Sequence, residues 1–403
     1  FKFCYFRCVK KFLIILVLVS CETNSSQNLN NLIFDEIKKT NLPPVVMGKI
    51  HRSGEMKFYS FGPSKWNRKD TIRKNNIFAI ASLTKAITSV AALQLVENGQ
   101  IKLDDPLDNI LPEMSAIKIL NNNNEIIKPT KSITLRNLLT HTAGFGYEFT
   151  SPKINNWTNL KKKVGWIEKS KPRLFEAGES FMYGPNSDWV GILIERLSGM
   201  NLEDYFRKHI TGPLEMNSTW FNVPDSLHYL VVNKSERTGI NTFKNIDFTK
   251  PKIKKKFSGG AGLFSTPEDY SKFLLCMLNK GNANGKRIIK ESTFDKLNTK
   301  QLSKFNQIHR PVNVKYIESR PRGDKDNFFD NYDNWTLGWA YEQNSKYRPT
   351  GTAYWGGWNN YFTIDFKNEF AIIYMNFLSP FNDLESYNLF TSFEKLVYKD
   401  HLN

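Results

Sequence analysis

The chain has 403 residues, of which 40% are hydrophobic and 14% aromatic, enough for a large core or two subdomains that share one site. Basic residues outnumber acidic ones by 56 to 39, and the excess lies in runs such as 161–163 and 250–256. Because no recognised nucleic-acid-binding motif accompanies these runs, we expect no nucleic-acid partner and interpret them as a solvated basic face near an anionic membrane.

The first twenty residues resemble a targeting segment. Basic residues precede an apolar run over 12–19, which is too short to span a bilayer. The run leads into the letters LVSC, ending at Cys21, which are similar to a bacterial lipoprotein signal whose cysteine is acylated after cleavage. We therefore expect a signal peptide over 1–20, a lipid-anchored tether over 21–31 and a place in the bacterial cell envelope, facing the periplasm or the exterior. The alternative is an ordinary secretory signal with a chance cysteine.

The four cysteines predict no disulfide. Cys4 and Cys8 would leave with the signal, and Cys21 would carry lipid. Cys276 lies inside an apolar run, so we expect a buried thiol without a partner.

The remaining chain, 32–403, predicts an α+β fold. Apolar periodicity and turn residues indicate strands over 45–50, 57–61, 337–341, 361–365 and 370–374. Helical patterns cover 32–39, 82–97, 136–140, 189–197, 202–210, 265–278 and 384–398. Strands at both ends around a helical middle predict an antiparallel sheet built from both chain ends, flanked by helices, with a mostly helical inserted domain. We expect an α/β subdomain over 32–81 and 258–403 and a helical subdomain over 82–257.

Ser82 and Lys85 open the helix after the first strands. Their spacing places a hydroxyl and an amine on one face, one turn apart, so the amine can activate a weak nucleophile. Two other serines, Ser115 and Ser392, also have lysine three residues later. Only Ser82 heads a segment that reads as a buried helix, where free N–H groups favour developing negative charge. Ser82 is therefore the candidate nucleophile.

Two further segments carry residues suited to the same chemistry. Tyr183 lies on a Gly-Pro loop before a helix and can pass a proton between the serine and a leaving group, although a lone tyrosine is more often a core aromatic. Gly356 and Gly357 follow Trp355, and paired glycines allow close approach of a ligand and leave an N–H free as an oxyanion donor. The alternative for the glycines is a simple bulge.

Together these segments resemble the serine β-lactamase and penicillin-recognising superfamily, specifically class C β-lactamase-like esterases and D-amino peptidases. Ser82-Leu83-Thr84-Lys85 matches the S-x-x-K motif, Tyr183 the Y-x-N tyrosine and Trp355-Gly356-Gly357 the K-T-G triplet. Three further stretches match landmarks of the family: 103–107, 133–144 and 259–269. The resemblance implies catalytic roles for Ser82, Lys85 and Tyr183 and an oxyanion hole from the backbone N–H groups of Ser82 and Trp358.

Two departures from the family pattern bear on the substrate. Pro185 stands where the family has an asparagine, with Asn186 one place later, and Trp355 stands where β-lactamases have a carboxylate-binding lysine. Both changes remove features that suit peptides and β-lactams, as in the esterase branch. We expect Trp355, Gly356, Gly357 and Asn186 to contact substrate, with Arg348 the first candidate for a replacement cation.

The expected activity is serine hydrolysis of an ester or related acyl bond through a Ser82 acyl-enzyme. Either neutral Lys85 with a Tyr183 phenol or a Lys85 ammonium with a tyrosinate fits the sequence. The alternatives are a D-amino peptidase or weak class C-like β-lactamase, and a non-catalytic binding descendant of the same fold. We expect a monomer with a small-molecule acyl substrate and neither cofactor nor metal, because the six histidines are scattered. His141 is tempting as a base, but we interpret it as a structural hydrogen-bonding residue.

Overall fold

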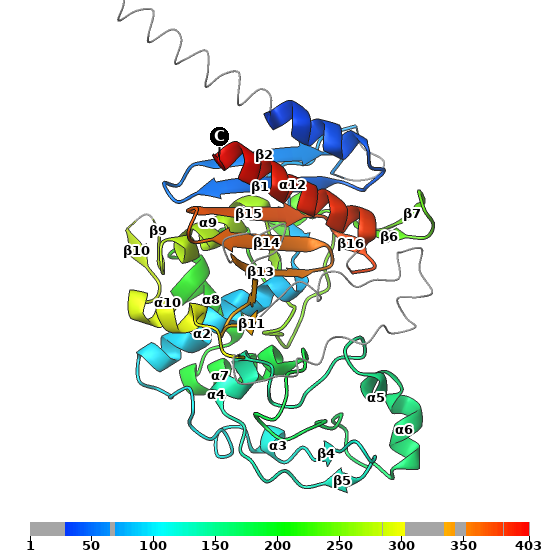
Figure 1. Cartoon of the computed structure of the whole chain (residues 1–403), viewed down its shortest axis with the longest axis vertical. Coiled ribbons are helices and arrows are strands. Elements are labelled where there is room, and N and C mark those ends of the chain that lie inside the picture. Colours follow the sequence, from blue (N-terminus) through cyan, green and yellow to red (C-terminus); the bar gives the residue numbers. More distant parts are fainter. Residues whose placement is uncertain are drawn as a thin grey trace, which may run out of the picture. The chain divides into compact units, whose positions relative to one another are not determined.

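The computed structural model describes residues 29–64, 69–283, 285–302, 334–342, 352–381 and 383–402 (Figure 1). Contacts divide the chain into two compact units, one of Pro43–Leu384 and one of Phe1–Leu42 with Glu385–Asn403. The described residues do not include four of the residues discussed above: Cys4, Cys8, Cys21 and Arg348.

The larger unit contains a seven-stranded antiparallel sheet in the order β11-β12-β13-β14-β15-β1-β2. Its strands are β1 (Val45–His51), β2 (Met56–Phe61), β11 (Asn334–Trp335), β12 (Ala340–Glu342), β13 (Thr352–Gly357), β14 (Asn360–Asp365) and β15 (Phe370–Met375). Strands β1 and β15, far apart in sequence, pair directly, with Gly48 opposite Ile373. The predicted antiparallel sheet built from both chain ends is confirmed.

One predicted strand begins later than expected. Residues 337–339 are apolar or small and buried, but they form a tight turn between β11 and β12, in which the N–H of Thr336 donates to the carbonyl of Trp339. These residues are apolar or small because they are buried, and a buried turn has the same apolar pattern as a buried strand. Strand β12 therefore starts at Ala340, not at Leu337.

Helices make up most of the regular structure in the middle of the chain, as predicted. Its helices are η1 (Ala81–Leu83), α2 (Thr84–Glu97), α3 (Pro112–Ser115), α4 (Leu135–Leu139), α5 (Pro152–Asn155), α6 (Trp157–Lys163), α7 (Asn186–Ser198), α8 (Leu202–Phe206), η2 (Arg207–Thr211) and η3 (Asp225–Leu230). Four short strands lie in the same region: β4 (Ile119–Leu120), β5 (Ile126–Ile127), β6 (Lys234–Arg237) and β7 (Phe243–Ile246). Outside it, β3 (Phe78–Ala79) pairs with β8 (Phe264–Ser265), and β16 (Leu378–Ser379) pairs with β6. The exact subdomain limits given above stay a prediction.

Helix α2 is buried along almost its whole length and carries Lys85 in its first turn. Small alanines on several sides let neighbouring elements, including α7, approach closely. The helix ends at Glu97, and Gly99 follows with a positive φ of 73°, the backbone that a glycine stop accommodates without strain. The predicted buried helix and its Asn-Gly end are both confirmed.

Helix α9 (Pro267–Leu278) packs against β1 and β15 (Figure 1). The Thr266 side chain accepts a hydrogen bond from the N–H of Asp269, and Pro267 begins the first turn, as predicted from the start signal. Cys276 lies buried in this helix, and burial raises the pKa of its thiol to about 12. After α9 come β9 (Asn282–Ala283), β10 (Lys286–Arg287) and α10 (Glu291–Asn298).

The smaller unit contains a helix over 29–38 and nearly all of α12 (Leu384–Leu402). Within this unit the N–H of Asn41 donates to the Glu385 carboxylate at 3.1 Å. The two helices agree with those predicted over 32–39 and 384–398. Among the described residues, no helix is both long enough and apolar enough to cross a membrane.

Candidate active site

A strained turn presents Ser82. Ala81, directly before it, is buried and has a φ of +45°, which for an alanine costs about 1–2 kcal/mol. The short helix η1 then leads into α2 without a break. A non-glycine residue keeps this conformation only where the surrounding structure fixes the backbone. Here that backbone determines where the Ser82 side chain points.

The structure brings Ser82, Lys85 and Tyr183 together. The hydroxyl oxygens of Tyr183 and Ser82 form a hydrogen bond of 2.8 Å. The Lys85 ammonium donates to Ser82 Oγ at 3.2 Å. Tyr183 comes from the loop before α7, about a hundred residues away in sequence, so only the fold makes this triangle. The serine thus has two groups in reach that can exchange a proton with it.

Lys85 is almost wholly buried and is held by several groups. Besides Ser82, it donates to the carbonyl of Gly260 at 2.7 Å and to the Tyr147 hydroxyl at 3.4 Å. Burial acts to lower the pKa of Lys85, but interactions with Tyr147, Tyr183 and the Asp188 carboxylate outweigh it, and the pKa lies above its ordinary value. The folded site therefore favours the ammonium form.

Tyr147 is a residue that the sequence reasoning missed. Its ring stacks on Phe149 at 5.1 Å and lies 5.5 Å from the ring of Tyr183. Burial raises the pKa of Tyr147, although the nearby Lys85 ammonium acts in the opposite direction, and the Tyr147 hydroxyl accepts a hydrogen bond from Lys85. Its only sequence signal was a Gly-Phe-Gly-Tyr loop directly after the Thr-Ala pair of the family landmark.

Asp188 holds the segment that carries Gly260. Its carboxylate accepts hydrogen bonds from the Ser258 hydroxyl and, at 3.1 Å, from the N–H of Gly260. The same residue Gly260 directs its carbonyl to Lys85. Asp188 lies in the first turn of α7, and Tyr183 lies in the loop just before this helix. The position of the start of α7 therefore determines where both side chains lie.

His141 and Asn186 lie behind Tyr183. His141 is wholly buried, and its Nδ1 accepts from the Asn186 amide at 2.9 Å. Burial and the nearby Lys85 charge hold the pKa of His141 well below its usual range, so the ring stays neutral. Its ring lies 4.7 Å from the ring of Tyr183. The structure thus places His141 in a supporting position, and the Asn186 side chain is turned toward it and fully buried.

The Trp355 ring packs against the ring of Tyr183. Its side chain is only 2% exposed, with ring centres 4.8 Å from Tyr183 and 4.6 Å from the buried Trp335. The indole therefore occupies the space beside the tyrosine ring as a packed, uncharged side chain. A lysine at this position would have to leave its ammonium in an aromatic enclosure.

The end of β13 approaches Ser82 closely. A Cβ atom added to Gly357 would lie 2.8 Å from the Ser82 nitrogen, and one added to Gly356 would lie 2.4 Å from the ring of Tyr361. Trp358 and Asn359 then form a two-residue hairpin turn with φ values of +49° and +57°, as in type I′ turns. This conformation is strained for tryptophan, and it places the Trp358 backbone next to the serine turn.

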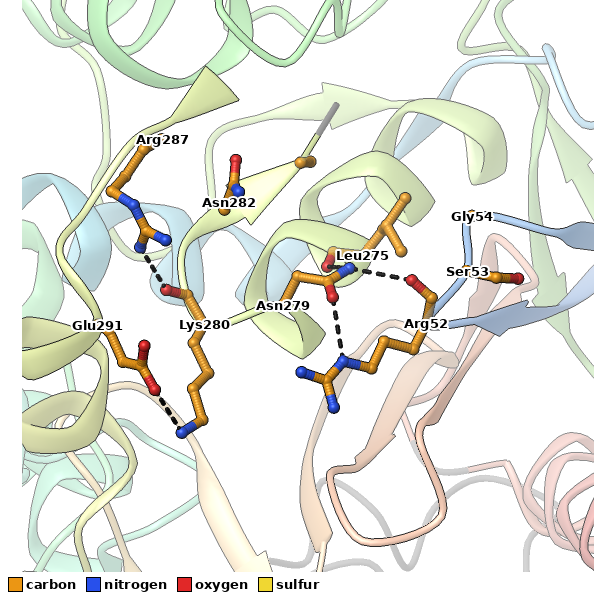
Figure 2. A pocket seen from close by; sticks show the side chains of 10 residues that line it. Arg52, Ser53, Gly54, Leu275, Asn279, Lys280, Asn282, Arg287 and Glu291 are labelled. Atoms are coloured by element: carbon orange, nitrogen blue, oxygen red, sulfur yellow. Dashed lines mark hydrogen bonds and ion pairs between the residues drawn. The ribbon is translucent and has the colours of Figure 1, made fainter. Parts of the chain in front are cut away.

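A separate polar cavity of about 410 Å³ lies beside α9 and β9 (Figure 2). Its cations are already engaged: Lys280 with Glu291, Arg52 with Asn279, and Arg287 with main-chain carbonyls. It contains none of the candidate catalytic residues, and we assign no ligand to it. Among the described residues, no group of three or more His, Cys, Asp or Glu is arranged to hold a metal ion.

Comparisons with known proteins agree with this geometry. A family model described as Beta-lactamase matches residues 29–385. An acyltransferase from Monascus pilosus is 30% identical over 68% of this chain and 71% of its own length. A lovastatin esterase from Penicillium rubens is 31% identical over 55% of this chain and 59% of its own length.

A solved structure has the same fold. A mutant of simvastatin synthase from Aspergillus terreus aligns with a TM-score of 0.78 and 23% identity, covering 93% of this chain and 94% of the other. At that identity the likeness concerns the fold. The predicted antiparallel sheet with a helical insertion is thus found in a solved relative.

Proposed function

Because this chain belongs to the Beta-lactamase family, we propose that it is a serine enzyme that cleaves an ester or related acyl bond through an acyl-enzyme on Ser82. The observation that carries the proposal is the triangle of Ser82 Oγ, Tyr183 Oη and Lys85 Nζ, with its 2.8 Å and 3.2 Å hydrogen bonds. The names of the acyltransferase and the lovastatin esterase support acyl chemistry in this branch.

In the proposed mechanism, Ser82 Oγ attacks the substrate carbonyl while its proton passes to the Tyr183 oxygen. The raised pKa of Lys85 favours its ammonium, so we assign the proton-accepting role to Tyr183 as a phenolate and the stabilising charge to Lys85. The Lys85 nitrogen lies 4.9 Å from the centre of the Tyr183 ring. The tyrosine then returns the proton to the leaving alkoxide, which departs as an alcohol and leaves the acyl group on the serine.

The tetrahedral intermediate needs donors for its oxyanion. We assign this role to the N–H groups of Ser82 and Trp358, supported by the close approach of Gly357 to the Ser82 nitrogen. A donor of this kind contributes about 3–4 kcal/mol to the transition state. Water or a second alcohol then attacks the acyl-enzyme, so hydrolysis and acyl transfer differ only in the acceptor.

For the substrate, we propose uncharged esters rather than β-lactams or peptides. The packed indole of Trp355 stands where β-lactamases have a cation, and the Asn186 amide is turned toward His141. Removing one partner of a desolvated ion pair costs about 2–5 kcal/mol, so a substrate carboxylate loses roughly 10²-fold or more in discrimination. Arg348 remains the sequence candidate for a replacement cation.

Two measurements test the proposal. After fluorophosphonate treatment, mass spectrometry should find the adduct on Ser82, whereas an adduct on Ser115 or Ser392, or none, would contradict it and favour a non-catalytic binding protein. Aryl acetate or butyrate should then exceed a chromogenic cephalosporin and a D-Ala-D-Ala peptide in kcat/KM. Faster turnover of either of the latter would favour the β-lactamase or peptidase alternative.

Membrane attachment is a second, separate proposal. It rests on the LVSC sequence before a lipid-modified Cys21, and the relatives described above give it no support. Metabolic labelling with an alkyne fatty acid should mark the unaltered chain and not a Cys21→Ser variant. Equal labelling of both would rule out lipidation at this residue.

A further inference from the structure

Two loops next to β6 and β7 expose isoleucines to solvent. Strands β6 and β7 form a hairpin whose loop carries Ile240, which is 81% exposed. The segment after β7 carries Ile253, which is 84% exposed. Among the described residues only Ile167 is a more exposed large apolar side chain. The two isoleucines lie on the segments that precede and follow β7, and covering their apolar surface would be favourable.

The chain around these two isoleucines is strongly basic. Between 240 and 256 the chain has six lysines and one acidic residue, Asp247, which gives a formal charge of +5. Five of these lysines are exposed and, within the described part of the chain, none of the five forms an ion pair: Lys244, Lys250, Lys252, Lys255 and Lys256. The sixth, Lys254, is half-buried and donates to the carbonyl of Gly262 at 2.6 Å, so it fixes the segment to the body of the unit.

We call Ile240, Ile253 and the five exposed lysines the lysine–isoleucine surface. Aromatic contacts join it to the candidate active site. The ring of Phe248 packs edge-on against Phe377 at 5.2 Å, and Phe377 stacks on Trp358 at 5.4 Å. The ammonium of Lys234 in β6 lies 4.9 Å from the centre of the Trp358 ring. Lys234 in β6 and Phe248 after β7 therefore connect the segments that carry the surface to the turn at Trp358.

We propose that the lysine–isoleucine surface binds the headgroup layer of an anionic lipid bilayer, with Ile240 and Ile253 entering the interface. Lysines near such a surface each strengthen binding about fivefold, and a buried apolar side chain adds to this. Exposed isoleucines on two separate segments, among exposed lysines, suit a fluid layer that can cover each side chain. A nucleic acid would instead favour aromatic or arginine side chains that stack on bases.

The binding step does not depend on the proposed function. Binding by this surface would bring the β6–β7 hairpin to the bilayer, together with the turn at Trp358 that Lys234 contacts. An acyl compound dissolved in the membrane would then meet the site without crossing bulk water. Binding and turnover can be measured apart, so failure of one proposal leaves the other standing.

The test uses the full chain and vesicles of phosphatidylcholine with and without phosphatidylglycerol, read by co-sedimentation at physiological salt. K252Q/K255Q/K256Q should weaken binding to the anionic vesicles by about 100-fold. The matched control is K286Q/K290Q/K296Q, which removes the same charge around β10 and α10. Figure 1 shows those elements at the opposite end of the sheet from β6 and β7. Equal weakening by both variants would overturn the proposal.

The apolar contribution has its own control. I240S/I253S should weaken vesicle binding by about tenfold, whereas I167S, at a side chain of similar exposure, should leave it unchanged. Because every variant retains the apolar run 12–19, any binding by that run is common to all of them. If I240S/I253S binds as the unaltered chain does, the surface does not enter a bilayer and an acidic protein partner becomes the better explanation.

Discussion

At the scale of single residues, the candidate site depends on how Lys85 is kept charged in a buried position. Three oxygen atoms, from Ser82, Tyr147 and Gly260, accept hydrogen bonds from its ammonium. A buried cation is stable only when such acceptors replace water. The Ser82 and Tyr147 hydroxyls can each be removed by substitution, whereas the Gly260 acceptor is a main-chain carbonyl.

Lys85 and Tyr183 should act as a coupled pair. Lys85→Ala and Tyr183→Phe should each lower kcat by about 10²-fold or more, because each removes one partner of the proton transfer. The double variant should lose little more than either single variant, since the two residues act in one step. Steady-state kinetics on an aryl ester measures all three. Near-normal turnover in Tyr183→Phe would reduce that residue to packing against Trp355.

Tyr147→Phe should have a smaller effect than Tyr183→Phe. The change removes one long acceptor of the Lys85 ammonium and keeps the ring that stacks on Phe149. A hydrogen bond to a charged group contributes about 1.5 kcal/mol at the lower end, which corresponds to roughly a tenfold loss in kcat/KM. A loss as large as that of Tyr183→Phe would instead make Tyr147 a catalytic residue.

At the scale of elements, the start of α7 places the Asp188 carboxylate where it favours the charged form of Lys85. The carboxylate contributes to the raised pKa of Lys85, so Asp188→Asn should lower that pKa. Because the proposed mechanism needs the ammonium, the alkaline limb of the kcat/KM profile should move to lower pH. Asp104→Asn is the matched control, since Asp104 pairs with Arg136 on the surface. Movement of the acidic limb instead would indicate that neutral Lys85 is the base.

The close approach of β13 to η1 is a second property of the elements. Gly357→Ala would place a Cβ 2.8 Å from the Ser82 nitrogen and 3.1 Å from Ser82 Cβ, so the strand must move away from the serine turn. We expect a loss of kcat of about 10²-fold with an unchanged circular dichroism spectrum. Gly99→Ala is the control: its Cβ meets nothing within 4 Å, and its positive φ affects stability alone. An active Gly357→Ala variant would show that this approach is not needed.

Much of this arrangement follows from local sequence, and some does not. The helical spacing of large apolar residues in α2 and the continuous apolar run of β15 predicted those elements, because buried positions take apolar side chains. Tyr147 was not predicted, since a tyrosine in a glycine loop has no periodicity and gains its role only when folding places it 3.4 Å from Lys85. The predicted strand start at Leu337 was wrong because residues 336–339 form a buried turn, and a short buried segment has the same apolar pattern whether it is a turn or a strand.

At the scale of the whole molecule, a buried ion pair connects parts of the larger unit that are far apart in the chain. Arg237 in β6 makes two hydrogen bonds to the carboxylate of Asp383, one of them 2.9 Å long, and both side chains are at most 4% exposed. The two residues are 146 positions apart. Arg237 also donates to the carbonyl of Ile240, so the pair supports the loop between β6 and β7 as well.

Breaking this pair should cost more stability than any surface ion pair. Asp383→Asn leaves a buried guanidinium without its counter-charge and should lower the free energy of unfolding by about 3–5 kcal/mol, measured by urea titration. The exposed Lys280–Glu291 pair provides the control: Glu291→Gln should change stability little, because water screens both charges. R237M/D383L should recover most of the loss, since apolar groups of similar volume need no partner. If Asp383→Asn is as stable as the unaltered chain, other groups must hold the Arg237 charge, and the hairpin does not depend on this contact.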